Sequence, residues 1–360
     1  MCDIATQLIH WQKQHGRHHL PWQGTRDPYA IWLSEIMLQQ TQVATVTPYY
    51  QRFMQRFPDI KSLSLGPLDD ILTLWSGLGY YARARHLHQA AKVIMKNYGG
   101  TFPSQMDLIQ QLPGIGRSTA AAIAVFAFGK QQAILDGNVK RVFTRFFGIE
   151  GYPGNQKIQN QLWEKATVLL PKEKGTNDIE TYTQALMDLG AIICTRNKPK
   201  CNICPLQQNC IALRENRVST LPTRKSRRPL PEKETVFLML MKQKKILLEK
   251  RPSPGIWSEL WCPPEMITSE DAMAYCARHY NVKITPLDNM PILNHSFTHF
   301  KLRIYPKLLK VIPPIDSTQN KGRWVTLDEA LASAIPTPVR KLLKQIETHQ
   351  YFYQEISQNG

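Results

Sequence analysis

Acidic residues are scarce in this sequence relative to basic ones. Its 360 residues include 28 Asp and Glu against 45 Lys and Arg, which leaves a formal net charge of +17. Such an excess indicates a polyanionic partner, either nucleic acid or an anionic membrane surface. No apolar run approaches the roughly 20 residues that cross a bilayer, and the start "MCDIATQLIHWQKQHG" lacks the apolar core and cleavage site of a secretory signal. We therefore expect nucleic acid as partner, no membrane and a cytoplasmic location.

Cysteines are too few and too unevenly placed for a disulfide framework. There are seven, an odd number, and four of them fall within 17 residues, a distribution that favours a metal centre in a reducing compartment. These four have the spacing C-x6-C-x2-C-x5-C, which suits zinc or a [4Fe–4S] cluster. Zinc sites more often carry two C-x2-C pairs and only one occurs here, but the spacing alone leaves both metals open, with unpaired structural thiols as the remaining alternative. The four are Cys194, Cys201, Cys204 and Cys210.

Strand-like alternation is missing from the first 213 residues, and internal repeats and low-complexity tracts are missing throughout. From residue 4 to about 213, apolar residues recur at spacings of three and four residues, which predicts helices. Residues 214–233 carry seven basic residues, two acidic ones and three prolines, a composition typical of a linker that can lie along phosphates. Residues 234–360 predict a mixed α+β domain, with strands within 235–251, 291–309 and 322–327 and helices near 269–280 and 336–347.

The stretch "LPGIGRSTAAAIAVFAFG" places a Gly-x-Gly turn, Gly114 and Gly116, directly before an alanine-rich segment. Glycines let backbone N–H groups face outward, and a following helix N-terminus then forms a phosphate cradle. The segment "PSQMDLIQQL" ahead of the turn predicts a short helix, so the pattern is helix–hairpin–helix. An ordinary connection between packed helices is the alternative. Asp136 ends an apolar run twenty residues later and by itself is typical of a helix N-cap.

Together these motifs resemble the helix–hairpin–helix DNA glycosylase superfamily, and in detail its MutY-type adenine DNA glycosylase branch. The resemblance rests on "LPWQGTRDPYAIWLSEIMLQQTQVATV", "WSGLGYYARARHLHQAA", "ILDGNVKRV", "MDLGAIICTRNKPKCNICPLQQNC" and the late "HSFTHF". It covers nearly the whole chain and is most specific through residue 213. It implies an all-α catalytic region, 1–213, and a Nudix-like lesion-recognition domain, 234–360, joined by the basic linker. It also implies a [4Fe–4S] cluster on the four cysteines and a nucleoid-associated location.

The resemblance implies a base excision enzyme that hydrolyses the N-glycosidic bond of adenine opposite 8-oxoguanine or guanine. A buried base must first be flipped out of the duplex, and the chemistry then needs an acid and an ionised carboxylate. Apolar neighbours around Glu35 would raise its pKa and make it the general acid/base, although an exposed helical glutamate is the alternative. Asp136 matches the aspartate that stabilises the oxocarbenium-like sugar, with Asn138 and Lys140 in the same turn.

Ser118 stands where the related endonuclease III branch has a lysine that attacks the sugar and nicks the strand. Serine cannot form that Schiff base, so base excision without strand cleavage is predicted. The resemblance places Gln40, Thr41, Leu78 and Tyr80 against the orphaned partner base. Helix packing is the alternative for these side chains, above all for Leu78.

In the second domain the lesion-sensing loop is predicted at Phe297, Thr298 and His299. The family's usual Phe-Ser-His has threonine in its middle position here, which keeps the hydroxyl and adds a methyl group. The sequence after Gly255 lacks the acidic cluster of a Nudix hydrolase, so this domain is expected to recognise rather than hydrolyse. The rival hypotheses are a bifunctional lyase for oxidised pyrimidines and a non-enzymatic DNA-binding module, and the active protein is expected to be a monomer.

Overall fold

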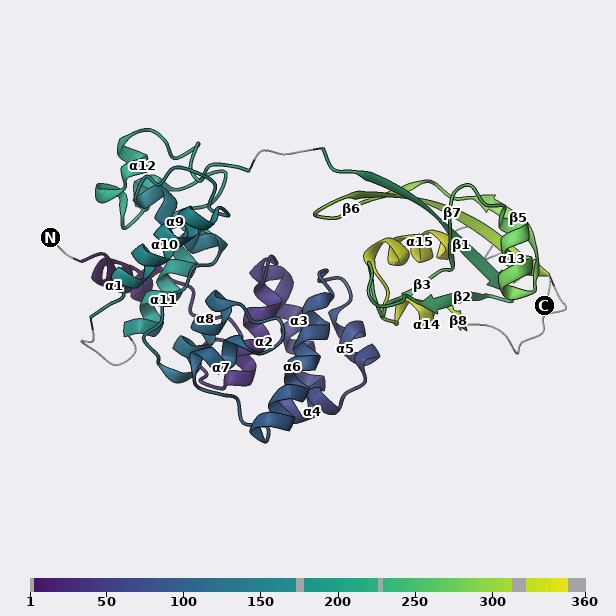
Figure 1. Cartoon of the computed structure of the whole chain (residues 1–360), viewed down its shortest axis with the longest axis horizontal. Helices are drawn as coiled ribbons and strands as arrows, with labels where there is room; N and C mark the ends of the chain where they lie inside the picture. Colours follow the sequence, from purple (N-terminus) through teal and green to yellow (C-terminus); the bar gives the residue numbers. More distant parts are fainter. Residues whose placement is uncertain (1–2, 173–177, 226–228, 313–321, 349–360) are drawn as a thin grey trace. The chain divides into compact units, whose positions relative to one another are not determined.

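The chain folds into two compact units. The computed structural model describes residues 3–172, 178–225, 229–312 and 322–348. The first unit comprises residues 1–65 and 86–227, and the second comprises 66–85 and 228–360. The predicted fold class, a helical region followed by an α+β region, is confirmed (Figure 1). The domain boundaries predicted from composition, after 213 and before 234, stay a prediction.

The first unit is helical throughout its described residues. Its α-helices are α1 (Ile4–His15), α2 (Pro28–Leu38), α3 (Val43–Arg56), α4 (Ile60–Leu65), α6 (Ala82–Tyr98), α7 (Met106–Gln110), α8 (Arg117–Phe128), α9 (Gly137–Phe146), α10 (Gln156–Val168), α11 (Asp178–Asp188) and α12 (Ile211–Arg214). Helix α6 enters this unit only at residue 86, because its first residues belong to the second unit. A π-helical turn, η1 (Leu189–Ile193), continues α11, and two 3-10 turns follow, η2 (Cys201–Ile203) and η3 (Gln207–Asn209).

The long apolar-periodic stretch 30–53 is broken into α2 and α3. The break follows from Gln40, whose φ of 57° lies in the left-handed region that interrupts a right-handed helix. Asp27 caps α2 by accepting a hydrogen bond from the Tyr29 amide at 3.0 Å, and Pro28 occupies the first helical position. The cap and the turn together fix which residues of α2 are presented at its end.

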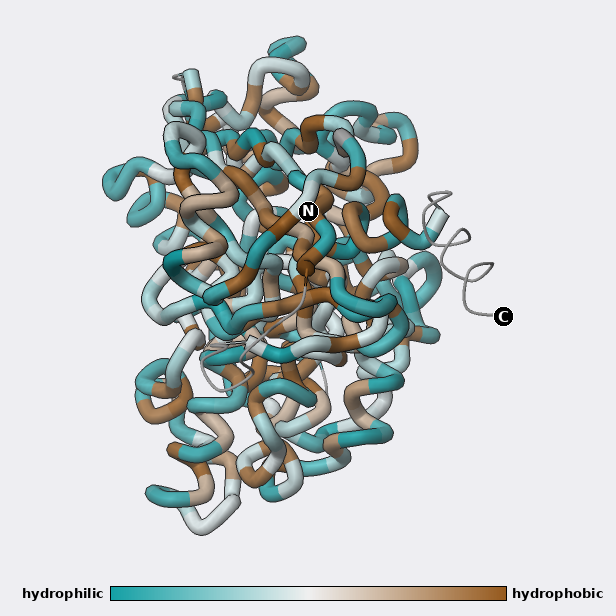
Figure 2. Tube along the Cα trace, turned by 90° about the vertical axis from the view of Figure 1, so that its right-hand side faces the viewer, coloured by the Kyte–Doolittle hydropathy of each residue, from teal (hydrophilic) through white to brown (hydrophobic). Residues whose placement is uncertain are grey.

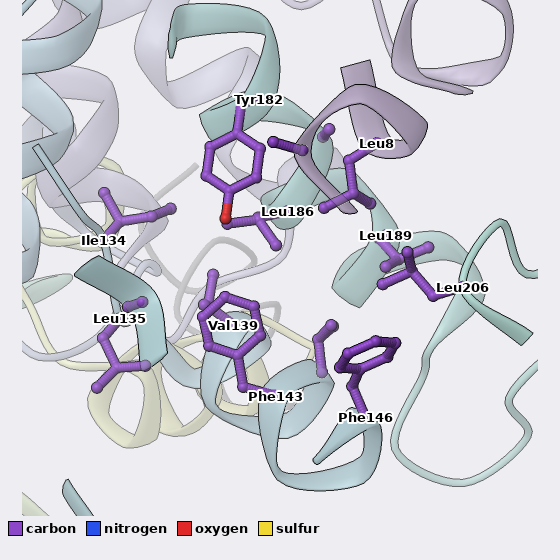
Figure 3. Close-up of a cluster of buried hydrophobic side chains, with 14 of the residues drawn as sticks. Leu8, Ile134, Leu135, Val139, Phe143, Phe146, Tyr182, Leu186, Leu189 and Leu206 are labelled. Atoms are coloured by element: carbon purple, nitrogen blue, oxygen red, sulfur yellow. The ribbon is translucent and has the colours of Figure 1, made fainter. Parts of the chain in front are cut away.

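A hydrophobic core packs α1, α8 and α10 against α9 and α11. Leu135 and Val139, on either side of Asp136, both point into this core, where Phe143, Tyr182 and Leu186 also lie (Figure 3). Leu135 is 3% exposed and Val139 is fully buried. Burial of two such side chains contributes about 1.5–3 kcal/mol each, so the core holds the backbone at Asp136 in one conformation.

The second unit contains a mixed sheet. Its strands are β1 (Glu232–Lys242), β2 (Lys245–Lys250), β3 (Trp261–Cys262), β4 (Glu265–Met266), β5 (Lys283–Asn289), β6 (Leu293–Ser296), β7 (Lys301–Ile312) and β8 (Arg323–Thr326). The path of pairing runs β3–β2–β1–β7–β5, with β1 and β7 parallel from Glu232↔Lys301 to Met241↔Lys310. Helices α13 (Ala272–Tyr280), α14 (Leu327–Leu331) and α15 (Thr337–Glu347) accompany the sheet, and α13 shares its apolar core.

Helix α5 (Leu68–Trp75) and the turn after it also belong to the second unit. Asp69 forms an ion pair with Lys250 on β2 at 2.8 Å and accepts a hydrogen bond from the Trp261 indole at 3.3 Å. Hydrophobic and hydrophilic residues are interleaved along the trace (Figure 2). Among the described residues, no helix combines the length and apolar character needed to cross a membrane.

Candidate active site and cysteine cluster

Glu35 is the one charged residue of α2, whose sequence is PYAIWLSEIML. Its neighbours Leu33, Ser34, Ile36 and Met37 are all buried, so the carboxyl is set in an apolar helix. Burial, and to a lesser extent the nearby charge of Asp136, raise the pKa of Glu35 to about 8. The carboxyl is therefore mainly protonated at neutral pH and able to donate that proton.

Glu35 lines a pocket of about 570 Å³. Apolar side chains such as Leu38, Val43 and Phe126 line this pocket, and so do the amide side chains of Gln12 and Gln184. A cavity of this size, lined by both apolar and polar side chains, suits a flat organic ligand that stacks and forms hydrogen bonds. An acid in the wall of such a pocket can protonate a bound heterocycle.

Asp136 is the N-cap of α9. Its carboxylate accepts a hydrogen bond from the Val139 amide at 2.7 Å. Burial raises its pKa, whereas the Val139 and Asn138 amides and the positive charges of Arg141 and Lys140 lower it. Burial is the largest of these causes, and the pKa of Asp136 is raised overall. The charge of Asp136 is in turn among the causes that raise the pKa of Glu35, so the two carboxyls interact.

The Asn138 side chain stabilises the first turn of α9. Its side-chain oxygen accepts a hydrogen bond from Arg141 at 2.8 Å. Gly190 packs against it so closely that a Cβ at Gly190 would lie 2.5 Å from the Asn138 Cβ. Arg141 also donates to the Cys194 carbonyl at 2.7 Å. Lys140 lies partly buried in the first turn of α9, and its charge acts on Asp136.

The Gly-x-Gly turn joins α7 and α8 as a hairpin. Leu112 and Ile115 are buried and anchor it, whereas Gly114 and Gly116 are exposed. Gly114 has a φ of 78°, and a Cβ there would lie 2.7 Å from the His86 Cβ. Gly116 is the N-cap of α8, and a Cβ there would meet no atom within 4 Å. The exposed edge of the turn therefore consists of backbone.

Ser118 lies in the first turn of α8 and reaches the segment before Asp136. Its hydroxyl accepts a hydrogen bond from the Leu135 amide at 3.0 Å. The structure therefore brings Ser118 to the residue adjacent to Asp136 in sequence. A second link joins α2 to α8, where the Gln39 side-chain amide donates to the Thr119 hydroxyl at 3.4 Å.

The four residues predicted to face the partner base are divided between the units. Gln40 and Thr41 lie in the first unit, Gln40 exposed and Thr41 partly buried. Leu78 and Tyr80 lie in the second, where Leu78 is 6% exposed and Tyr80 is 48% exposed. The role predicted for all four stays a prediction.

The four clustered cysteines line one small cavity of about 30 Å³. All four are partly buried, and none forms a disulfide. In the described part of the chain, no three His, Cys, Asp or Glu side chains are already arranged around one metal position. The four thiols nonetheless line a common space, and four thiols are the donor set of a soft-metal centre.

Arg145 supplies the charge that such a centre requires. It is 3% exposed, and its guanidinium donates to the carbonyls of Leu221, Thr195 and Arg196 and to the Cys194 sulfur at 3.4 Å. None of these partners is a carboxylate. A buried cation normally needs an opposing charge, and four thiolates around a metal cluster would provide it, so the residues present fit an anionic cysteine-bound cluster.

In the second unit, the predicted lesion loop forms the hairpin between β6 and β7. The Phe297 amide donates to the Phe300 carbonyl at 2.8 Å, and the Phe297 ring stacks on Phe300 and contacts Trp257. Thr298 and His299 are exposed at the tip. Aromatic packing thus fixes the base of the hairpin and leaves its tip accessible.

Sequence reasoning did not identify the polar wall of the Glu35 pocket. Arg17 lines it and contacts the fully buried Asp188 through its amide at 2.8 Å and its guanidinium at 2.6–2.7 Å. Gln184 donates to the same carboxylate at 2.8 Å. Arg145 was likewise not predicted. Arg17 and Asp188 are 171 positions apart, so no local pattern points to the pair.

Two family models match the chain. The model described as "HhH-GPD superfamily base excision DNA repair protein" matches residues 33–167, and the model described as "NUDIX domain" matches residues 235–345. The first range contains Glu35, the hairpin and Asp136, and the second contains the β6–β7 hairpin.

Curated relatives and a solved structure extend the likeness. The adenine DNA glycosylase of Buchnera aphidicola subsp. Baizongia pistaciae is 40% identical over 342 residues, 94% of this chain and 95% of that protein. The rat adenine DNA glycosylase is 33% identical over 406 aligned residues, 95% of this chain and 78% of that protein. A thermostable thymine-DNA glycosylase structure aligns with a TM-score of 0.53 and 32% identity over 59% of this chain and 95% of that one. Because the likeness to adenine DNA glycosylases runs through both units, the chain belongs to the adenine DNA glycosylase family of base excision repair enzymes.

Proposed function

We propose that this adenine DNA glycosylase removes adenine paired with 8-oxoguanine, and with guanine, from duplex DNA without cutting the strand. The observation that carries the proposal is the Glu35 carboxyl, kept protonated at neutral pH in the wall of a pocket of about 570 Å³. Adenine is a poor leaving group until its ring is protonated, and a proton donor held in the wall of the pocket meets that requirement. The target base would enter this pocket after flipping out of the duplex.

Asp136 would stabilise the sugar cation left when the glycosidic bond breaks. Its carboxylate is held by the Val139 amide and lies near enough to Glu35 to raise the pKa of that residue. Glu35, once deprotonated, would accept a proton from the attacking water. Asn138 and Arg141 would keep the first turn of α9 in place while the charges change.

Strand cleavage would require an amine near the sugar. Ser118 would stand at that place instead, and its hydroxyl accepts a hydrogen bond from the Leu135 amide. A hydroxyl cannot form a Schiff base with the opened sugar. The product would therefore be an intact strand with an abasic site.

DNA would be held through its phosphates by the hairpin backbone at Gly114 and Gly116, by Lys140 and by the basic segment that follows α12. A solved structure named as a non-covalent endonuclease III–DNA complex shares the fold of 59% of this chain, with a TM-score of 0.50 and 21% identity. Gln40, Thr41, Leu78 and Tyr80 would lie against the orphaned partner base. The tip at Phe297, Thr298 and His299 would contact 8-oxoguanine, and the protein would act as a monomer.

Cys194, Cys201, Cys204 and Cys210 would hold a [4Fe–4S] cluster. The cluster would cross-link the loop between η1 and α12 and neutralise the charge of Arg145, because its cysteine-bound form is anionic. Base hydrolysis transfers no electrons, so the cluster would support the fold and DNA binding. Anaerobically purified protein is expected to contain roughly four irons per chain, and Cys204→Ser to lose iron and DNA affinity together. Stoichiometric zinc in place of iron would contradict the assignment.

The decisive experiment is a single-turnover assay on a duplex with one adenine opposite 8-oxoguanine, treated with or without alkali. Wild type is expected to give breaks only after alkali, and Glu35→Gln to give none while still binding the duplex. A matched control is Glu180→Gln, another carboxyl in the pocket wall, engaged with Arg26 at 2.8 Å. Breaks without alkali would contradict the monofunctional mechanism, and an unchanged rate in Glu35→Gln would remove Glu35 from the role of acid.

A further inference from the structure

The turn that presents Tyr80 is attached to the C-terminal part of the second unit by one shared acceptor. The Ile335 carbonyl, between α14 and α15, accepts hydrogen bonds from the Ser76 hydroxyl at 2.8 Å and from the Tyr81 hydroxyl at 3.3 Å. Ile335 itself is fully buried. A carbonyl oxygen has two lone pairs, so this one can accept both bonds.

Each hydroxyl is also used as an acceptor. Tyr81 accepts a bond from the Gly77 amide at 3.3 Å, inside the turn. Ser76 accepts one from the guanidinium of Arg340, on α15, at 3.1 Å. Arg340 donates in addition to the Leu331 carbonyl at the end of α14, at 2.8 Å. The network therefore runs from α14 through Arg340 to both ends of the turn.

The turn needs such support because its backbone is unusual. Gly77, Gly79 and Tyr80 all have φ between 49° and 108°, and for Tyr80 that conformation is costly. Arg83 braces the outer side by donating to the Leu78 and Gly79 carbonyls at 3.3 and 3.1 Å. What remains accessible is the Tyr80 side chain, 48% exposed.

We propose that Arg340 is a positioning residue for adenine excision, which acts through Ser76 and the Ile335 carbonyl to hold Tyr80 ready to separate the mispaired bases. The inference rests on the proposed function and deepens it. The C-terminal part of the second unit then contributes to opening the base pair, in addition to any contact that the β6–β7 hairpin makes with the lesion. Loss of the guanidinium would leave the turn formed but free to move.

The test compares Arg340→Met with Lys344→Met, an exposed lysine one turn further along the same helix. Both lose one positive charge, but only the first loses the contact with Ser76. Single-turnover excision is measured on adenine opposite guanine and on adenine opposite a tetrahydrofuran abasic analogue, where no partner base has to be unstacked. Arg340→Met is expected to be slowed about tenfold on the first duplex, the effect of losing one charge-assisted hydrogen bond, and by less than about twofold on the second.

A second variant separates positioning from damage to the fold. Ser76→Ala is expected to give the same pattern, and the double variant to be no slower than the slower of the two single variants, because Arg340 acts through the hydroxyl that Ser76→Ala removes. Equal slowing on both duplexes, or additive effects in the double variant, would overturn the inference. So would an unchanged rate in Arg340→Met. If wild type fails to release adenine from either duplex, the proposed function itself is wrong, a result distinct from all of these.

Discussion

At the scale of single residues, the environment of Glu35 decides its chemistry. A carboxyl on the surface of a helix ionises near pH 4.5, but burial among Leu33, Ile36 and Met37 disfavours the charge. Asp136 adds to the effect because two neighbouring carboxylates repel each other. At neutral pH the buried Glu35 carboxyl therefore keeps a proton that a solvent-exposed carboxyl would lose.

This difference predicts the pH dependence of excision. Glu35 has a pKa of about 8, so its acid form is complete below that pH and is lost above it. The single-turnover rate on adenine opposite 8-oxoguanine is expected to fall about tenfold per pH unit above pH 8. Rates measured from pH 6 to 10 at saturating enzyme check this, and a rate that rises across that range would contradict an acid role.

Ser118 offers a second prediction at this scale. Its hydroxyl accepts a bond from the Leu135 amide, one residue before Asp136, so a longer amine at position 118 would extend toward the same region. Ser118→Lys is expected to produce strand breaks without alkali and a borohydride-trapped adduct with DNA. Thr119→Lys, one position along α8, is the matched control and should give neither product. Adduct formation by both variants would show nonspecific amine attack instead.

At the scale of elements, the hairpin between α7 and α8 contains two glycines, and different structural requirements favour glycine at the two positions. Gly114 combines a φ of 78° with a Cβ position 2.7 Å from His86, whereas Gly116 has room for a side chain. The first is required by the fold. The second leaves the backbone N–H groups open to a phosphate.

The two glycines therefore predict different defects. Gly114→Ala is expected to lower the free energy of unfolding by about 1–3 kcal/mol, since it adds both backbone strain and a clash. Gly116→Ala should change it by no more than about 0.5 kcal/mol yet weaken DNA binding, because its methyl would stand where a phosphate approaches. Urea unfolding and a DNA titration at fixed salt separate the two. Similar losses of stability in both variants would refute the distinction.

A comparison of these elements with the sequence shows which features of the structure the sequence predicted and which it did not. Periodicity and turn residues predicted the helical region, the strands within 235–251 and the helices near 269–280 and 336–347, since local chemistry determines these. Motifs led to Glu35, Asp136 and the four cysteines. The break at Gln40 was not predicted, because the left-handed φ of a glutamine has no sequence signal. Arg145 was missed because its partners, Leu221 and the Cys194 loop, come from distant segments.

At the scale of the whole molecule, the compact units do not follow chain order. Residues 66–85 lie between helices of the first unit in sequence but belong to the second. Polar contacts from Asp69, Ser76, Tyr81 and Arg85 connect residues 66–85 to the rest of the second unit. Arg85, for example, donates a hydrogen bond to the Ser258 carbonyl at 3.0 Å. These contacts join residues about 170–260 positions apart, so they can form only after the C-terminal strands and helices have folded.

This arrangement predicts the result of truncation. A fragment ending at residue 227 lacks Lys250, Ile335 and Arg340, the partners of α5 and its turn. Hydrogen exchange at the amides of residues 76–81 is expected to be at least about tenfold faster in the fragment than in the full chain, since each lost bond to a buried carbonyl or charged group stabilised the closed turn. Amides of α11, which lies wholly in the first unit, serve as the internal control and should exchange at the same rate in both. Equal protection of the turn in both proteins would mean that the first unit alone holds it, whereas faster exchange in α11 as well would show that the fragment as a whole is less stable.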